Sequence, residues 1–571
     1  MEYLKAYEQF LSHVKDPASL EELTSIQNDE KEIEDRFYRF LEFGTAGMRG
    51  HIAMGTNRMN IYTVRRSTKG LADYLNANGK AQQGVAIAYD TRKYSFEFAL
   101  ETSLVLNQNG IKTYLYETPH SVPQLSFTIL QLQCAGGVVI TASHNPKEYN
   151  GYKVYGEDGG QLAPDDADKI MSYINQIDDL FSIERMEEKD AIEAGLLNYI
   201  GKEIDEQYFA KVLELAHLPY NNIPIPSDFR VVYTPLHGTG IHSVPVILSR
   251  MGIENLHIVK EQENADPNFS TVSAPNPEQP DALDLAKKLA NQTNANLILA
   301  TDPDCDRLGV AARDTDGSFV SFTGNEIGLI IIDYMLTQMR NTNTLKDDSF
   351  MVKSLVSTDL ANVICKSFGV TMIDVLTGFK FIAEQIKLSK QTGKGTFIFG
   401  FEESFGYLSG TFVRDKDAAI ASMLVVKAAA YHASQNKTLA DALRDIFAKY
   451  SYCFDKTLSK TFAGIDGAEK IASILDQLKA APPKSFGKFQ VTAFRDYNIG
   501  LRTDFIAGTQ EKIDMPASNV LYFEMENAKL IVRPSGTEPK VKVYIGAMSK
   551  DREVAQANMD ELMHIAEELL Q

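Results

Sequence analysis

Three aspartates stand at alternate positions directly after an apolar run, in the segment Asp302-Pro303-Asp304-Cys305-Asp306. On an extended or turning loop, carboxylates at this spacing can point at one centre. Three hard oxygen ligands suit Mg²⁺, which prefers about six oxygens and often takes the others from phosphate and water. The segment therefore predicts a metal site, and a solvated acidic turn is the alternative interpretation.

Two other uses of clustered aspartates do not fit this segment. An EF-hand calcium loop needs Gly at its sixth position and Glu at its twelfth, and these positions hold Arg307 and Arg313. A phosphatase with an aspartyl nucleophile has Asp-x-Asp-x-Thr or Asp-x-Asp-x-Val, whereas the fifth residue here is Asp306. We therefore expect the nucleophile elsewhere in the chain.

A serine and a histidine end another apolar run, in the segment VVITASHNPKEYNGYKVY. A serine hydroxyl is a poor nucleophile alone, but it can carry a phosphoryl group when a metal neutralises the transferring oxygens. Ser143 is therefore a candidate phosphoserine, and His144 and Lys153 are candidates for assisting proton transfer. The alternatives are that His144 only orders the loop and that Lys153 is a surface lysine.

Two further loops suit a phosphorylated sugar. The loop RPSGTEPK combines a guanidinium, two hydroxyls and a glycine-exposed backbone, which together can cradle a phosphate dianion. A plain polar hairpin is the alternative. In the loop GFEESFGY, Glu402 and Ser404 would point the same way on an extended backbone and could accept hydrogen bonds from sugar hydroxyls.

A nucleotide ligand is not indicated. The glycine-rich segment FGTAGMRG, which contains Arg49, is neither GxGxxG nor a Walker loop. The nearest Walker-like segment, Gly393-Lys394-Gly395, lacks the Ser or Thr after lysine and the earlier glycine.

The overall charge excludes some partners. The chain has 76 Asp and Glu residues against 57 Lys and Arg residues, a formal net charge of −19. Because nucleic-acid binders usually present a basic face, we expect no nucleic-acid partner. Basic residues that bind an anion must therefore be gathered locally. No apolar run reaches about 18 residues, so we expect no membrane partner.

The N-terminus and the cysteines indicate a cytoplasmic protein. The segment MEYLKAYEQFLSHVKD mixes charged and apolar residues at helical spacing and lacks the apolar centre of a secretory signal. The cysteines are far apart and form no CxxC pair: Cys134, Cys305, Cys365 and Cys453. We therefore expect free thiols in a reducing cytoplasm.

The candidate loops follow a recurring pattern, in which a strand-like apolar run ends in a polar, glycine-rich loop and a helical pattern follows. The strand-like runs are Val85–Tyr89, Val138–Thr141, Val231–Thr234, Leu297–Thr301 and Thr396–Phe399. Strands that alternate with helices predict parallel sheets in α/β domains. Ligands of such sheets bind at the carboxyl ends of the strands, where these loops lie.

The last ~110 residues have a different pattern. A helix is predicted over Gly467–Ala480 and a terminal helix over Asp551–Leu570. Short strands are predicted between them, at Asn519–Met525, Lys529–Val532 and Lys540–Ile545. This order indicates a small α+β domain with an antiparallel sheet. With about 150 residues per domain, we expect four domains, at 1–205, 206–320, 321–454 and 455–571.

Together these segments resemble the α-D-phosphohexomutase superfamily. The matching segments are FGTAGMRG, TASHNP with NGYK, DPDCDR, GFEES and RPSGTEP, in the family's order and at its spacing over nearly the whole chain. FGTAGMRG, TGFKFI and GFEESFGY are most similar to the longer phosphoglucomutases, on the branch related to phosphopentomutase and glucose-1,6-bisphosphate synthase. The shorter glucosamine mutases match less well.

The resemblance implies an α/β fold of four domains around a central cleft. Three would be similar α/β sandwich domains and the fourth a C-terminal α+β domain with an antiparallel sheet, in a monomer or dimer. Ser143 would be the phosphorylated serine and would complete a Mg²⁺ shell with Asp302, Asp304 and Asp306.

The resemblance also implies roles for the remaining candidates. Arg49, His144, Lys153 and Arg307 match positions used near the reacting phosphate. Thr377, Gly378, Glu402, Ser404 and Lys416 would bind the sugar phosphate. Arg533, Ser535, Gly536 and Thr537 would hold the phosphate that is not transferred. His237, in the motif LHGTG, would have a supporting role.

The implied activity interconverts glucose 1-phosphate and glucose 6-phosphate through glucose 1,6-bisphosphate, which is both activator and intermediate. The partners would be small-molecule sugar phosphates. Mannose or pentose phosphates are alternative substrates, because a sugar loop only contacts hydroxyls. A simple phosphomonoesterase would need no second phosphate cradle. A catalytically silent scaffold is the alternative from another class, and the presence of the serine, the aspartates and the phosphate arginine argues against it.

Overall fold

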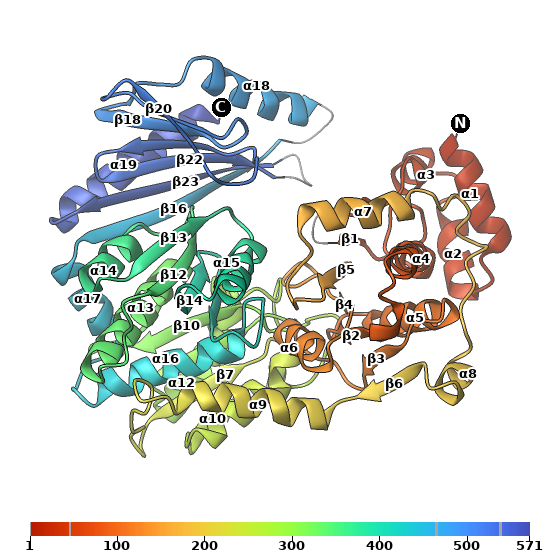
Figure 1. Ribbon diagram of the computed structural model, residues 1–571, viewed down its shortest axis with the longest axis horizontal. Coiled ribbons are helices and arrows are strands. Elements are labelled where there is room, and N and C mark those ends of the chain that lie inside the picture. Colours follow the sequence, from red (N-terminus) through yellow and green to blue (C-terminus); the bar gives the residue numbers. More distant parts are fainter. Residues whose placement is uncertain (1, 45–46, 463–465, 536–539, 571) are drawn as a thin grey trace.

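The structure is a computed structural model that describes residues 2–44, 47–462, 466–535 and 540–570 (Figure 1). Its strands form four sheets, and each sheet belongs to one part of the chain. In Figure 1 the first domain lies on the right, the C-terminal domain lies at the upper left, and the two middle domains lie below it. The predicted fold class, three α/β domains and a C-terminal domain with an antiparallel sheet, is confirmed.

The first domain has a six-stranded sheet in the order β1-β5-β4-β2-β3-β6. Its strands are β1 (Met48–His51), β2 (Val85–Tyr89), β3 (Thr113–Tyr116), β4 (Gly136–Ile140), β5 (Tyr149–Gly156) and β6 (Leu197–Ile200). Its helices are α1 (Glu2–His13), α2 (Pro17–Ser25), α3 (Glu30–Phe37), α4 (Ile61–Ala77), α5 (Ser95–Gln108), α6 (Val122–Leu132), α7 (Pro164–Ile174) and α8 (Glu188–Glu193).

The second domain has a five-stranded sheet in the order β11-β10-β9-β7-β8. Its strands are β7 (Arg230–Thr234), β8 (Asn255–Ile258), β9 (Leu297–Thr301), β10 (Leu308–Arg313) and β11 (Phe319–Ser321). Its helices are α9 (Lys202–Ala216), α10 (Val244–Arg250), α11 (Lys260–Glu263) and α12 (Asp284–Thr293).

The third domain has a four-stranded sheet in the order β13-β12-β14-β15. Its strands are β12 (Ser349–Ser354), β13 (Thr371–Val375), β14 (Thr396–Glu402) and β15 (Gly406–Ser409). Its helices are α13 (Gly324–Asn341), α14 (Leu360–Phe368), α15 (Phe379–Thr392), α16 (Ala418–Ala433) and α17 (Leu439–Lys449).

The C-terminal domain has an antiparallel sheet in the order β16-β23-β22-β21-β18-β19-β20, with β17 paired to β18. Its strands are β16 (Tyr452–Thr461), β17 (Ser485–Phe486), β18 (Phe489–Asp496), β19 (Leu501–Asp504), β20 (Thr509–Lys512), β21 (Leu521–Met525), β22 (Ala528–Pro534) and β23 (Lys540–Ser549). Its helices are α18 (Asp466–Ala480) and α19 (Arg552–Leu569). The proposed limit between residues 454 and 455 lies inside β16.

The parallel strands lie in the hydrophobic core, as the apolar runs predicted. All residues of β2, β4 and β9 are buried, which is the pattern of strands covered on both faces. Polar side chains cap the first turns of helices that follow these sheets and fix where the helices begin. Thr323 and Glu326 form a capping box at the start of α13, and the Asp417 side chain accepts from two backbone N–H groups at the start of α16.

The expectation of a helix after each strand-like run is wrong at three loops. β4, β9 and β14 are each followed by an antiparallel neighbour, β5, β10 and β15. The returning segments are buried at almost every position. Continuous burial suits an added strand, whereas a surface helix needs a polar face. The sequence prediction also missed β16 to β20 of the C-terminal sheet.

All four cysteines are buried and form no disulfide, as expected. Within the described ranges, no helix combines the length and the apolar composition that crossing a membrane requires.

Gly70 fixes how closely α4 and α7 pack. A Cβ at Gly70 would lie 2.3 Å from Ile174 Cγ1 and 2.8 Å from the Ile174 backbone nitrogen. We expect Gly70→Leu to destabilise the protein by about 1–3 kcal/mol or more through overpacking, measured as a lower midpoint of thermal unfolding. Ala77→Leu places the same side chain at an exposed position of α4 and should leave the midpoint unchanged. Equal midpoints for both variants would contradict this account.

Candidate active site

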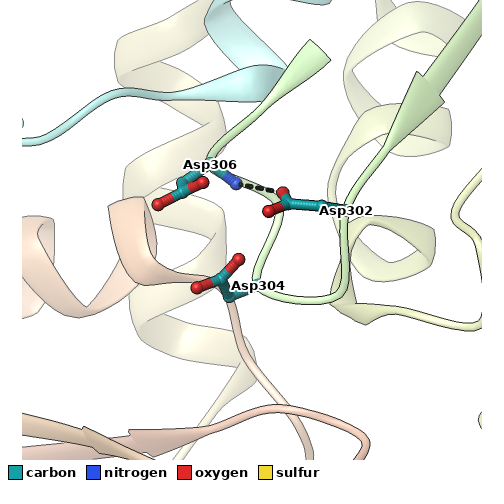
Figure 2. A group of neighbouring side chains, drawn as sticks. All are labelled: Asp302, Asp304 and Asp306. Carbon is teal, nitrogen blue, oxygen red and sulfur yellow. Dashed lines mark hydrogen bonds between the residues drawn. The ribbon is translucent and has the colours of Figure 1, made fainter. Parts of the chain in front are cut away.

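The predicted metal loop, residues 302–307, connects β9 to β10 and gathers its carboxylates at one point. Ligand oxygens of Asp302, Asp304 and Asp306 all lie within 4.8 Å of one another. Figure 2 shows the three side chains side by side on the loop, where the Asp306 backbone N–H donates to Asp302 Oδ1 at 3.2 Å. The Arg307 N–H donates to the same oxygen at 3.0 Å, so the loop backbone itself fixes Asp302.

The carboxylate cluster fits a divalent cation. All three side chains are buried, yet Asp304 Oδ1 and Asp306 Oδ1 have no hydrogen-bond partner. Burial and the neighbouring aspartates raise the pKa of Asp302 well above its usual value. Burial also opposes ionisation of Asp304, but Lys153, a hydrogen bond with Asp302 and the charge of Lys416 together outweigh it and lower the pKa of that carboxyl. Buried carboxylates with unpartnered oxygens are the donor set that a hard cation satisfies.

Ser143 reaches this cluster from the loop between β4 and β5. Its Oγ donates to Asp302 Oδ2 at 2.9 Å and lies 3.2 Å from His144 Nδ1. The residue is buried and has a φ of 53°, a left-handed conformation that costs energy for a non-glycine residue. Its backbone N–H donates to Thr141 Oγ1 at 2.8 Å. The serine is therefore held in one orientation, with its hydroxyl at the aspartates.

Arg92 holds the serine loop, and the sequence analysis did not assign it. Its guanidinium donates to the carbonyl oxygens of Ser143 and Asn145, both at 2.5 Å. It also donates to the carbonyls of Pro146 and Tyr149, at 2.8 and 3.1 Å. Arg92 follows β2, which pairs in parallel with β4. The shared edge of those strands was the signal that could have identified it.

Lysines from two different domains flank the aspartates. Lys153 Nζ on β5 donates to Asp304 Oδ2 at 3.0 Å, because the antiparallel return of β5 brings it back beside the serine loop. Lys416 Nζ lies 2.9 Å from Asp306 Oδ2. Burial alone would lower the pKa of Lys416, but Asp306 and Asp415 raise it above its usual value. Both predicted lysines are thus placed at the cluster, and Lys153 is no surface residue.

Two arginines lie close to the serine. Arg49 Nη1 donates to Asn145 Oδ1 at 2.9 Å, and Arg307 Nη1 donates to Glu278 Oε1 at 2.7 Å. Burial, followed by the charges of Arg307 and Arg49, lowers the pKa of His144 well below its usual value. The site thus collects the local positive charge that an anionic substrate requires in an acidic chain.

The predicted sugar residues meet at the end of β14. Glu402 Oε1 accepts from the Gly378 N–H at 2.8 Å, and the adjacent Thr377 Oγ1 is buried without a hydrogen-bond partner. Burial raises the pKa of Glu402 to about 7, although Lys416 opposes this shift. Ser404 follows β14 and is half-buried.

The predicted phosphate loop joins β22 to β23. Gly536 and Thr537 lie outside the described residues. The Ser535 N–H donates to the Lys540 carbonyl at 2.7 Å, and Arg533 pairs in register with Lys542. Burial lowers the pKa of Lys542, and Arg533 and Lys540 lower it further. Lys542, on β23 beside this loop, is therefore a further basic residue that the sequence analysis did not select.

The ring of His237 makes its hydrogen bonds outside the carboxylate cluster. Its ring nitrogens contact the Asn264 carbonyl at 2.9 Å and Thr271 Oγ1 at 2.8 Å. The loop that contains it also contacts the metal loop, because the Thr239 N–H donates to the Pro303 carbonyl at 2.8 Å.

Sequence models of the phosphoglucomutase/phosphomannomutase family match the chain in four consecutive parts. The α/β/α domains I, II and III match residues 41–181, 206–317 and 323–450, and the C-terminal domain matches residues 506–562. The chain belongs to this family. Loops from its first three domains meet at Ser143 and the aspartates, so the site described above is assembled from several family domains.

Individual relatives agree with this membership. The chain is 39% identical over 520 residues to a Staphylococcus saprophyticus protein named phosphoglucomutase, covering 90% of this chain and 92% of that protein. It is 37% identical to a Staphylococcus aureus phosphoglucomutase, over 92% of this chain and 93% of that protein. The solved open form of the Paramecium phosphoglucomutase parafusin shares the fold, with a TM-score of 0.65 at 17% identity, covering 92% of this chain and 94% of that one.

The raised pKa of Glu402 makes a prediction about stability. The pKa of Glu402 is 4.5 in the unfolded chain and about 7 in the folded protein. Because the folded state holds this proton more tightly, the folded protein loses stability as the pH rises from 4.5 to about 7. Glu402→Gln removes this loss, so we expect the variant to be more stable than the parent by up to about 3 kcal/mol at pH 8. At pH 5 the advantage should fall below about 1 kcal/mol.

Urea unfolding of parent and variant at both pH values measures this difference. Glu254→Gln, at an exposed position, should show no pH-dependent difference from the parent. A Glu402→Gln advantage that is equal at pH 5 and pH 8 would exclude a raised pKa at this residue.

Proposed function

We propose that this chain is a phosphoglucomutase that interconverts glucose 1-phosphate and glucose 6-phosphate. The observation that carries the proposal is the hydrogen bond from Ser143 Oγ to Asp302, inside a buried carboxylate cluster with unpartnered oxygens. A hydroxyl in that position is suited to carry a phosphoryl group rather than to bind a substrate. The relatives named phosphoglucomutase, which match over about 90% of the chain, support the same activity.

Asp302, Asp304, Asp306 and an oxygen of Ser143 would hold Mg²⁺. When bound, the ion neutralises charge on the oxygens of the transferring phosphoryl group. The chemistry of the donors supports this ion, since hard carboxylate oxygens suit Mg²⁺.

The chain's own residues would carry out two transfers. The phosphorus–oxygen bond of phospho-Ser143 breaks, and a new one forms to the free hydroxyl of glucose 1-phosphate. The hydroxyl proton would pass to the neutral His144 imidazole, whose pKa is lowered by burial, while Lys153 would assist as a hydrogen-bond donor. Glucose 1,6-bisphosphate would then turn around in the site. The phosphorus–oxygen bond at its C1 would break as a new one forms to Ser143 Oγ, the base would return its proton to the C1 oxygen, and glucose 6-phosphate would leave.

The remaining residues would hold the substrate in both orientations. Arg49 and Arg307 would contact the reacting phosphate, and the side chain of Arg307 would exchange Glu278 for it. Glu402, Ser404 and Lys416, with Thr377 and Gly378, would bind the sugar. Arg533 and Ser535, with Gly536 and Thr537, would hold the other phosphate. Fixing both ends of one sugar supplies the positioning on which phosphoryl transfer mainly depends. We place this reaction in the cytoplasm, since unpaired cysteines suit a reducing compartment.

A coupled assay tests the activity. We expect glucose 1-phosphate, Mg²⁺ and catalytic glucose 1,6-bisphosphate to give glucose 6-phosphate, detected with glucose 6-phosphate dehydrogenase, without release of inorganic phosphate. Chelation of the metal should stop turnover. Phosphate release without isomerisation would mean a hydrolase. Faster turnover of mannose or pentose phosphates would assign a different substrate, and no turnover of any sugar phosphate would favour a silent scaffold.

Ser143→Ala tests the phosphoserine. We expect the variant to lose at least about 10⁴-fold in kcat, because alanine has no hydroxyl to carry the phosphoryl group between the two transfers. Mass spectrometry should find phosphate on Ser143 in the parent, and thermal unfolding should confirm that the variant is folded. Turnover within tenfold of the parent by folded Ser143→Ala would exclude the phosphoserine mechanism.

A further inference from the structure

A buried lysine crosses the junction between the third and C-terminal domains. Lys529 lies on β22 and is 2% exposed. Its Nζ donates to the Ser357 carbonyl at 2.5 Å and to Asp359 Oδ1 at 3.0 Å, both in the third domain. Burial alone would lower the pKa of Lys529, but Asp359 and Asp455 raise it above its usual value. The ammonium therefore remains charged and bonded across the junction.

The sheet register makes room for this lysine. Gly546 on β23 pairs with Lys529 on one side and with Asp455 on the other. A Cβ at Gly546 would lie 3.1 Å from Asp455 Oδ1 and 3.1 Å from Lys529 Cε. Because Gly546 has no side chain, Lys529 can lie across β23 toward the third domain.

On the far side of the junction, the Ser357 contact leads to the sugar loop. Ser357 Oγ accepts from the Glu403 N–H at 3.1 Å and lies 2.7 Å from Ser354 Oγ. Ser354 Oγ donates to Glu403 Oε2 at 2.9 Å. Both serines are fully buried, so their hydroxyls fix the main chain and the side chain of Glu403.

Glu403 has little freedom to move independently. It stands between Glu402 and Ser404, the residues proposed to hold the sugar. A Cβ at Gly324, at the start of α13, would lie 2.0 Å from the Glu403 carbonyl oxygen. A shift of Ser357 would therefore be transmitted to the sugar loop.

At its other end, the strand of Lys529 leads to the phosphate loop. β22 carries Lys529 near its start and Arg533 near its end. Arg533 and Glu403 both act electrostatically on Tyr544 and Lys542 of β23. One strand thus connects the lysine to the phosphate loop, while one serine connects it to the sugar loop.

We infer that Lys529 is a positioning residue. Through Ser357 and Glu403 it sets the sugar loop, and through β22 it sets Arg533 of the phosphate loop, at the spacing of one substrate. This inference rests on the proposed function, because it assumes that both loops bind one sugar phosphate. Lys529 touches neither the substrate nor the reacting atoms. It acts on the groups that bind the parts of the substrate that do not react, so its loss should weaken binding more than it slows the chemical step.

Lys529→Met tests the inference in the coupled assay. We expect KM for glucose 1-phosphate to rise about tenfold or more while kcat falls by much less, because small misplacements of binding groups have large effects. Lys529→Arg keeps the charge and should restore most of the affinity. Lys427 is also buried, on α16, and donates to the Ile223 carbonyl at 3.3 Å. Lys427→Met is the matched control and should leave KM unchanged even if it lowers stability.

Ser357→Ala removes the hydroxyl but keeps the carbonyl that Lys529 contacts, so it tests the same path with a smaller change. We expect it to raise KM as well, and the double variant to raise KM by less than the product of the single effects. Folded Lys529→Met and Ser357→Ala with the parent's KM would overturn the inference, and so would equal losses in Lys529→Met and Lys427→Met. An inactive parent would instead refute the proposed function.

Discussion

The arrangement of the site depends on three carboxylates buried at one point. Uncompensated charge in a protein interior is costly, and Asp302, Asp304 and Asp306 sit together in one loop of the second domain. Their partners come from elsewhere, since Lys153 belongs to the first domain and Lys416 to the third. The same charges that prepare a cation site therefore also hold these domains in contact. The positions of the side chains around the aspartates therefore depend on three domains and not on the metal loop alone.

Hydrogen bonds to the backbone maintain the precision of the loops around this cluster. Arg92 binds the carbonyls of the serine loop, and Asp417 caps α16 immediately after Lys416. Each of these side chains fixes a turn next to a reactive group and does not face the substrate itself. Preorganisation of this kind lowers the cost of aligning phosphate, metal and hydroxyl when the substrate arrives.

Much of this could be predicted from the sequence, and the reason for each miss is physical. The aspartate spacing and the apolar runs β2 and β9 are local signals, so the metal cluster and the strands could be inferred. Arg92 could have been found from the predicted parallel strands, because β2 and β4 share a sheet edge. The register that pairs Lys542 with Arg533 is not visible in a single sequence. The antiparallel returns were taken for helices because apolar runs buried on both faces lack a distinctive period.

The antiparallel return after β4 has a consequence for how the chain can change. On β5, Lys153 faces the aspartates while its neighbours Tyr152 and Val154 pack into the core. Inserting or deleting one residue between Ser143 and Tyr149 would shift the register and exchange the two faces. A hydrophobic side chain would then point at the carboxylates and an ammonium at the core. The length of this connection is therefore constrained as strictly as its chemistry, and substitutions there should be tolerated more readily than changes in length.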